Sequence, residues 1–157
     1  MVSLFVRNLL FTILQPGIVA GLIPFWIVED KVKQSFSHSL QFYHYAGGLA
    51  FLIGLVTMLA CIISFGVKGK GTLSPADPTK KLVATGFYKF SRNPMYIGVI
   101  LILIGEAIFF QSTPLWIYAA FIFLAFNTFI VLVEEPRLTE DFGEEYTSYR
   151  KKVRRWI

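Results

Sequence analysis

Two apolar runs joined by a short polar stretch decide the fold. Residues 94–133 have the sequence PMYIGVILILIGEAIFFQSTPLWIYAAFIFLAFNTFIVLV. Each run approaches the length of roughly 20 residues that an α-helix needs to cross a bilayer. The polar joint, Gln111–Pro114, is short enough for a tight reversal. We therefore expect a helical hairpin whose limbs span Pro94 to Gln111 and Pro114 to Val133.

Both limbs of this hairpin begin with a typical helix start. Asn93-Pro94 precedes the first limb, and Thr113-Pro114 precedes the second. Asn and Thr can cap the free N–H groups of a helix, and proline at the first helical position loses no hydrogen bond.

The hairpin predicts which residues meet at its open end. Both limbs rise by about 1.5 Å per residue, so residues equally far from the joint lie at equal depth. Glu134-Glu135 therefore return to the level of Ser91, Arg92 and Asn93. We call these five residues the polar cluster and expect it where the two helices leave the membrane.

The composition indicates an integral membrane protein. The 157 residues are 55% hydrophobic, with a mean hydropathy of +0.59. Two further apolar blocks, Leu4–Val28 and Tyr45–Val67, complete an all-α protein with four transmembrane helices. A polar outer loop with room for a short interfacial helix, Glu29–Gln41, separates these two blocks. We divide the chain into two N-terminal transmembrane helices (1–71) and one integrated unit of linker, hairpin and tail (72–157).

Histidine and cysteine usage argues against a metal site. The single cysteine, Cys61, excludes an internal disulfide and a multi-cysteine zinc site. His38 and His44 lie six positions apart, which does not place two ligands on one helical face. We expect no metal.

The basic residues predict the orientation in the membrane. The net charge is +5, and most lysines and arginines lie in the linker 68–92 and in the tail after residue 133. Because Lys and Arg accumulate on the cytoplasmic side, we place the linker, the tail and both termini there. Flanking a membrane, these charges suit anionic headgroups of the lipid bilayer, and we expect no nucleic-acid partner.

The tail has an apolar stripe. Leu138, Phe142, Tyr146 and Tyr149 recur at helical spacing and share one face. This face either lies on the membrane or closes over the polar cluster as a lid.

Several residues within the apolar blocks keep alternative interpretations. Glu106 either marks a function, as ionisable residues in membrane spans often do, or is a carboxylate near the outer interface or hydrogen-bonded between helices. Asn127 either bonds across the hairpin or lines a pocket. Gly47, Gly48 and Gly54 permit close contact between helices.

The polar cluster suits one ligand in particular. Glu134 offers an anion to an ammonium group, and Arg92 offers a planar fork to a carboxylate. Phe87, Tyr88 and Tyr96 offer ring faces for a base or a cation. An amino-acid zwitterion that carries a sulfonium and a purine, S-adenosylmethionine, fits each of these groups. The alternative is a snorkelling arginine beside interfacial carboxylates.

The ordered motifs of the C-terminal half resemble the isoprenylcysteine carboxyl methyltransferase family, part of a broader group that includes phospholipid methyltransferases. They are KLVATGFY (81–88), RNPMY (92–96), the hairpin, Glu134-Glu135 and FGEEY (142–146) with Tyr149. The resemblance covers residues 72–155. It implies a cofactor enclosed by the linker and the tail, and an acceptor that arrives from the bilayer. The implied cofactor contacts fall on Lys80, Lys81, Leu82, Val83, Tyr88, Asn93, Pro94, Met95, Tyr96 and Glu134.

This chain departs from the family at three positions. Asn93 stands where the family usually has His, and Leu73 replaces a glutamine that contacts the cofactor in the eukaryotic enzymes. Ile130 replaces their substrate-binding arginine, and an apolar side chain cannot hold a prenylcysteine carboxylate.

We therefore predict an S-adenosylmethionine-dependent membrane methyltransferase with a lipophilic or small acceptor, a carboxylate or thiol rather than an amine. Arg92 and Glu135 are the candidate catalytic residues, with Glu135 a weak base. The alternatives are an NADPH-dependent reductase of the sterol-reductase type and a non-catalytic membrane scaffold.

Overall fold

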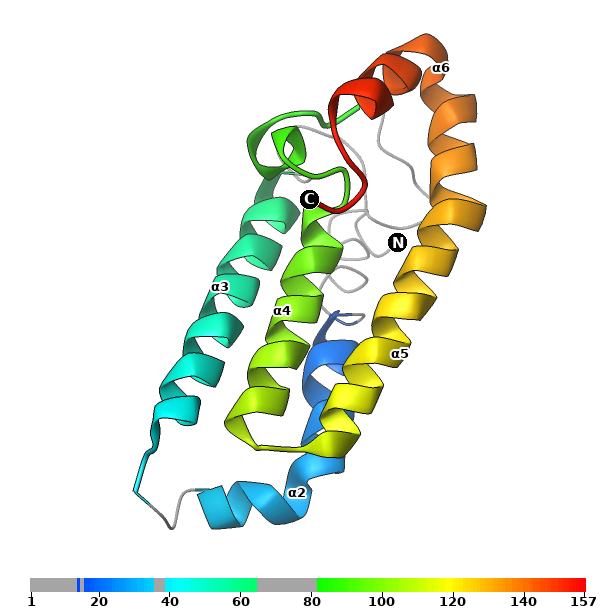
Figure 1. The fold of residues 1–157 in the computed structure, drawn as a ribbon. Coiled ribbons are helices and arrows are strands. Elements are labelled where there is room, and N and C mark those ends of the chain that lie inside the picture. Colours follow the sequence, from blue (N-terminus) through cyan, green and yellow to red (C-terminus); the bar gives the residue numbers. More distant parts are fainter. Residues whose placement is uncertain (1–13, 15, 36–38, 65–81) are drawn as a thin grey trace, which may run out of the picture.

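The computed structural model describes residues 14, 16–35, 39–64 and 82–157 (Figure 1). Every regular element in these ranges is helical. The elements in chain order are the π-helix η1 (Ile18–Leu22), α2 (Ile23–Ser35), α3 (Phe42–Ser64), the 3-10 helix η3 (Gly86–Lys89), α4 (Pro94–Phe109), α5 (Thr113–Phe129), the π-helix η4 (Ile130–Glu134) and α6 (Glu135–Lys152).

The predicted helical hairpin is present as α4 and α5. Its second start differs from the prediction: Ser112 is the capping residue, and its hydroxyl accepts a hydrogen bond from the N–H of Leu115. Thr113 is already the first helical residue, whereas the backbone at Ser112 is still extended. Asn93 occupies the N-cap position of α4, but its side chain makes no capping bond there.

The second limb continues past its predicted end at Val133. The helix runs through η4 into α6 and continues to Gly143, where a backbone kink separates the two halves of α6. The helix tolerates Pro136 because the π-helix η4, which directly precedes this region, has a wider turn than an α-helix. A proline lacks an N–H and clashes with the carbonyl four residues earlier, and a π-turn relieves both problems. The same arrangement recurs at η1, which lies just before Pro24.

Helices α3 and α4 pack closely through glycines. A Cβ added to Gly47 would lie 2.6 Å from the backbone nitrogen of Phe109, and one added to Gly54 would lie 2.6 Å from the carbonyl oxygen of Gly98. Such separations are below van der Waals contact, so only glycine permits this approach. The prediction is confirmed for Gly47 and Gly54. It is wrong for Gly48, where a Cβ would meet no atom within 4 Å.

Two helical segments of the described residues, α3 and the stretch from Thr113 to Lys152, are long and apolar enough to cross a bilayer. With 16 residues, α4 is apolar but shorter than a full span. The first part of the first predicted span, Leu4–Val28, lies outside the described residues, which begin there with residues 14 and 16–28.

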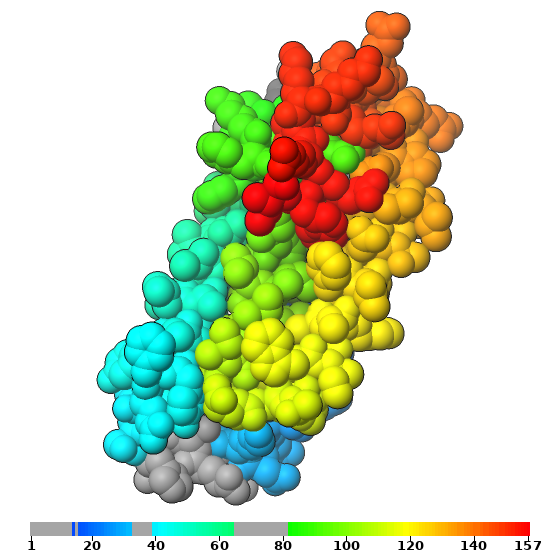
Figure 2. All heavy atoms as spheres, in the orientation of Figure 1, coloured from blue at the N-terminus to red at the C-terminus, as the bar shows by residue number. Residues whose placement is uncertain are grey.

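The segment predicted as a polar outer loop is partly helical. Residues 29–35 belong to α2, whose later part runs across the ends of the other helices near the α4–α5 turn (Figure 1). Residues 29–35 of α2 therefore supply the short helix that the predicted loop allowed. At the opposite end of the bundle, the last residues of the chain lie against α4 and α5 (Figure 2).

Candidate functional site

The hairpin brings the polar cluster together as predicted. Arg92 Nη1 lies 2.9 Å from Oε1 of Glu135, and both side chains are largely buried. One turn further along α4, the Tyr96 hydroxyl donates a 2.9 Å hydrogen bond to Oε2 of Glu134. These two contacts join the start of α4 to the junction of η4 and α6.

The chain after α6 returns to this site and bonds to the residues before α4. The Ser91 hydroxyl and the Asn93 amide both donate to the carbonyl oxygen of Arg155, at 3.1 Å and 3.0 Å. The N–H of Arg92 donates to the carbonyl oxygen of Arg154 at 2.9 Å. Asn93 is therefore engaged by the returning chain, which explains why it does not cap α4.

Arg155 is a member of the site that sequence reasoning missed. Its Nε donates to Oε1 of Glu135 at 2.7 Å, and its Nη2 donates to Oε2 at 3.1 Å. The bidentate geometry makes this a strong charge-assisted contact. Arg155 lies in the basic tail, for which the sequence predicts contact with lipid headgroups and not with a carboxylate. The sequence offered one signal for a second arginine at this site: the cluster contains two carboxylates, Glu134 and Glu135, and Arg92 can neutralise only one of them.

The two adjacent glutamates have different electrostatic surroundings. Glu135, which follows the apolar part of the helix, accepts from both arginines. Burial acts to raise the pKa of its carboxyl, but the hydrogen bond from Arg155 and the charges of Arg92 and Arg155 outweigh this effect, so the pKa lies below its ordinary value. Glu134 accepts from Tyr96 and forms no ion pair with any described residue. Burial raises the pKa of the Glu134 carboxyl above its ordinary value, and a cationic ligand beside it would favour the ionised form.

Arg92 also has unused hydrogen-bonding capacity. Its Nη1 donates to Glu135 and, at 3.3 Å, to the hydroxyl of Tyr146. Its Nε is buried and has no hydrogen-bond partner. Because an unpaired buried donor is costly, this N–H favours a ligand that brings an acceptor.

The tail closes over the polar cluster, which decides between the two predicted roles of its apolar stripe. Tyr146 is buried against Arg92, and the Tyr149 hydroxyl donates a 2.6 Å hydrogen bond to the carbonyl oxygen of Tyr88. The stripe does not form one straight face, because Gly143 interrupts α6 with a φ of 51°. This positive φ, which glycine adopts readily, turns the second half of α6 toward the site.

The remaining predicted contacts lie beside the cluster. Val83 and Tyr88 are buried with Cys61 in an apolar cluster on which Met95 packs, so the Tyr88 ring is a packing group here. Burial raises the pKa of Tyr88 well above its usual value. Leu82 is half-buried and Pro94 is buried at the start of α4. Lys80, Lys81 and Leu73 lie outside the described residues.

Two further polar residues of the hairpin lie outside the polar cluster. The Asn127 Oδ1 accepts a 3.2 Å hydrogen bond from Nε1 of Trp156, whose ring contacts Phe123, in place of the bond across the hairpin that was one of its two predicted roles. Glu106 lines a cavity at the far end of the bundle. Ile130 is fully buried.

The sequence of residues 42–145 matches the model of the phospholipid methyltransferase family. The chain belongs to this family. The matched range includes α3, the hairpin and both glutamates of the polar cluster, so the site described above lies mainly within it. The resemblance seen in the C-terminal motifs is thereby confirmed, and it extends to α3.

Individual relatives agree with this assignment. A methanethiol S-methyltransferase of Pseudomonas deceptionensis is 34% identical over 110 residues, which cover 64% of this chain and 39% of that protein. The protein-S-isoprenylcysteine O-methyltransferase of Saccharomyces cerevisiae is 28% identical over 142 residues, 87% of this chain and 58% of that protein. An uncharacterized protein of Haemophilus influenzae is 35% identical over 63 residues, 40% of this chain and all of that protein. No solved structure is significantly similar to this chain.

Proposed function

We propose that this chain is a methyltransferase that uses S-adenosylmethionine and methylates a thiol or carboxylate group. Its membership of a membrane methyltransferase family supports methyl transfer over the reductase and scaffold alternatives. The particular cofactor and the class of acceptor are inferred from the chemistry of the polar cluster.

One observation carries the proposal: a carboxyl without a described ion-pair partner and a buried cationic donor without an acceptor lie at the end of the hairpin. Glu134 has a neutral phenol as its hydrogen-bond donor and no described ion-pair partner. Arg92 presents a buried Nε without an acceptor. An amino-acid zwitterion complements both groups, with its ammonium at Glu134 and its carboxylate at Arg92.

The groups around these two residues fit the rest of the cofactor. Tyr96 fixes the Glu134 carboxylate, and the exposed Phe87 ring offers a face for a purine. Leu82, Met95 and Pro94 supply apolar surface nearby, and we also assign the predicted contacts Lys80, Lys81, Val83, Tyr88 and Asn93 to this pocket. When bound, S-adenosylmethionine supplies a methyl carbon activated by the adjacent sulfonium.

We assign Glu135 a positioning role in place of general base. Its two carboxylate oxygens accept from Arg92 and Arg155, and its pKa is lowered, so it binds a proton weakly. It holds Arg92 and the returning chain in place. An acceptor that needs a strong base, such as an alcohol or an ammonium group, therefore suits this site poorly.

A thiol is the acceptor that the site favours. In methyl transfer to a thiol, the S–H proton is lost to solvent, the acceptor sulfur forms a bond to the methyl carbon, and the bond from that carbon to the donor sulfur breaks. Among the relatives, one protein is named for methanethiol and another for isoprenylcysteine. Ile130 is apolar and fully buried, which argues against a carboxylate site at that position and favours a small or lipophilic thiol.

We further propose that the chain crosses the bilayer several times, with the polar cluster and both termini on the cytoplasmic side. The support is the concentration of exposed Arg150, Lys151, Lys152 and Arg154 at the same end as the cluster. Basic residues accumulate on that side of membranes.

The proposal is tested by methyl transfer in reconstituted membranes. Purified chain in nanodiscs would be incubated with S-adenosylmethionine labelled in the methyl group, and with methanethiol or an isoprenylcysteine analogue as acceptor. We expect label in the product from methanethiol, and loss of this product in Glu134→Gln. The absence of transfer to either acceptor, with labelled cofactor bound, would refute the assigned acceptor class.

A further inference from the structure

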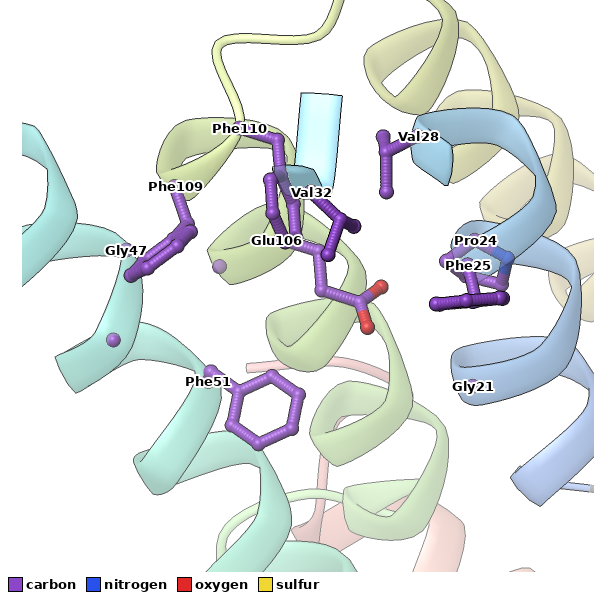
Figure 3. Close-up of a pocket in the computed structure, with 12 residues that line it drawn as sticks. Gly21, Pro24, Phe25, Val28, Val32, Gly47, Phe51, Glu106, Phe109 and Phe110 are labelled. Carbon is purple, nitrogen blue, oxygen red and sulfur yellow. The ribbon is translucent and has the colours of Figure 1, made fainter. Parts of the chain in front are cut away.

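A cavity lies at the opposite end of the bundle from the polar cluster. It has a volume of about 380 Å³ and lies between α2, α3 and the last turns of α4 (Figure 3). Its lining is almost entirely apolar, with Glu106 the one ionisable residue among the lining groups. The proposed methyl-transfer chemistry does not use it.

Glu106 directs its carboxylate into this cavity, between Phe51 of α3 and Phe25 of α2 (Figure 3). Its Oε2 is buried and has no hydrogen-bond partner. A buried carboxylate oxygen without a partner costs free energy that a bound ligand can recover. An apolar side chain at this position would pack at no such cost.

Lys31, a cation of the α2 helix that lines this cavity, is engaged outside the cavity. Lys31 of α2 donates through Nζ to the carbonyl oxygens of Gln111, at 2.7 Å, and Phe110, at 3.4 Å. It thereby caps the end of α4, and no ion pair between Lys31 and Glu106 is formed. The cavity therefore contains an acid but no described base to neutralise it.

We propose that this cavity binds an organic ammonium ion with an apolar body. The ammonium would pair with the Glu106 carboxylate, and its substituents would pack on the rings of Phe25, Phe51 and Phe110, which line the same space. Carboxylates and aromatic faces both attract such cations, and the attraction strengthens where water is excluded. A volume of 380 Å³ accommodates a small ammonium compound.

This site is separate from the cofactor pocket. Glu106 lies ten residues after Tyr96 on α4, which corresponds to about 15 Å along the helix axis. A ligand at Glu106 therefore does not contact Glu134 or Arg92. Binding at Glu106 is a further activity of the chain and does not require methyl transfer at the polar cluster.

The glycines of the cavity wall permit a filling variant. Gly48 lines the cavity, and a Cβ there would meet no heavy atom within 4 Å. Gly47, its neighbour, packs against α4 and accepts no side chain. Gly48→Leu should therefore occupy cavity space without separating α3 from α4.

The test is calorimetric titration of the detergent-solubilised chain with benzyltrimethylammonium, with and without saturating S-adenosylhomocysteine. We expect one saturable site that S-adenosylhomocysteine does not displace. Glu106→Gln keeps the shape and removes the charge, and it should weaken binding by about tenfold or more. Gly48→Leu should weaken it similarly. Glu134→Gln, the same change in the polar cluster, should leave it unaltered.

The competing outcomes are distinct. Absence of saturable binding to the parent chain, or equal binding to Glu106→Gln or to Gly48→Leu, would overturn the proposal. Loss of binding in Glu134→Gln, or displacement by S-adenosylhomocysteine, would show that the probe occupies the cofactor pocket and would also overturn it. Gel filtration and far-ultraviolet circular dichroism of each variant verify folding. A chain that binds the ammonium but not S-adenosylhomocysteine would count against the methyl-transfer proposal alone.

Discussion

Tyr96 donates a 2.9 Å hydrogen bond to Glu134 and thereby connects the first turn of α4 to the end of η4. The neighbouring Glu135 is held instead by Arg92 and Arg155. Two consecutive glutamates thus have different partners: Glu135 is neutralised by two arginines, and Glu134, to which we assign the ligand, accepts from a phenol. The following predictions test these assignments.

Breaking the Arg92–Glu135 pair should destabilise the fold more than removing Arg155. Removal of one partner leaves the other charge buried and unpaired, which costs about 3–5 kcal/mol for a well-buried pair. Arg92 and Glu135 are both largely buried, whereas Arg155 is a third exposed. Thermal unfolding in detergent should therefore rank Arg92→Ala below Arg155→Ala, with Arg137→Ala, in an exposed pair, close to the parent. A reversed ranking would contradict the described burial.

The docking of the returning chain should be lost in acid. The folded-state pKa of Glu135 is lowered, so its contribution to stability is present above the ordinary value of 4.5 and is lost as the pH falls through the folded-state value. Trp156 reports this docking through its contacts with Asn127 and Phe123. In a Trp26→Phe, Trp116→Phe background, its fluorescence should change below pH 4.5. Glu135→Gln should abolish this acid transition.

Neighbouring glycines of α3 should respond oppositely to alanine. At Gly47 a Cβ would lie 2.6 Å from the backbone of α4, so Gly47→Ala must push the helices apart, at a cost of about 1–3 kcal/mol. At Gly48 the Cβ meets no atom, and alanine should stabilise the helix by up to about 1 kcal/mol. Unfolding midpoints of the two variants measure this contrast. Equal effects would contradict the close α3–α4 contact.

Removing the Tyr96 hydroxyl should weaken cofactor binding without abolishing it. Tyr96→Phe leaves the Glu134 charge in place but removes the donor that orients the carboxylate. A hydrogen bond to a charged group is worth about 1.5–3 kcal/mol, which corresponds to roughly a tenfold to hundredfold loss of affinity. Fluorescence titration with a cofactor analogue measures it. An unchanged affinity would place the cofactor away from Tyr96.

The sequence predicted the hairpin and the polar cluster because both follow from helix geometry. Two apolar limbs of similar length return Glu134 and Glu135 to the level of Arg92, whatever the side chains between them do. The cap at Ser112 differed from the prediction by one residue, since Ser and Thr are both capping residues and only the backbone decides between them. The continuation of the helix through Pro136 depended on a π-turn, which has no sequence signature of its own.

The role of the returning chain could not be predicted in the same way. Arg155 and Trp156 follow α6 in an irregular stretch, so no periodicity indicates their direction. Their partners Glu135 and Asn127 lie 20 and 29 residues earlier, on a helix from which they are separated by the break at Gly143. Glu106 posed a further difficulty, since its cavity depends on how α2 packs against α3 and α4.

The central claim, that Glu134 holds the ammonium group of the cofactor, is tested most directly by the affinity for S-adenosylhomocysteine. Calorimetry would compare the parent chain with Glu134→Gln and with Glu140→Gln, a matched change at an exposed position of α6. We predict saturable binding to the parent and to Glu140→Gln, and about a tenfold to hundredfold loss in Glu134→Gln. Parent-like affinity in Glu134→Gln would contradict the claim.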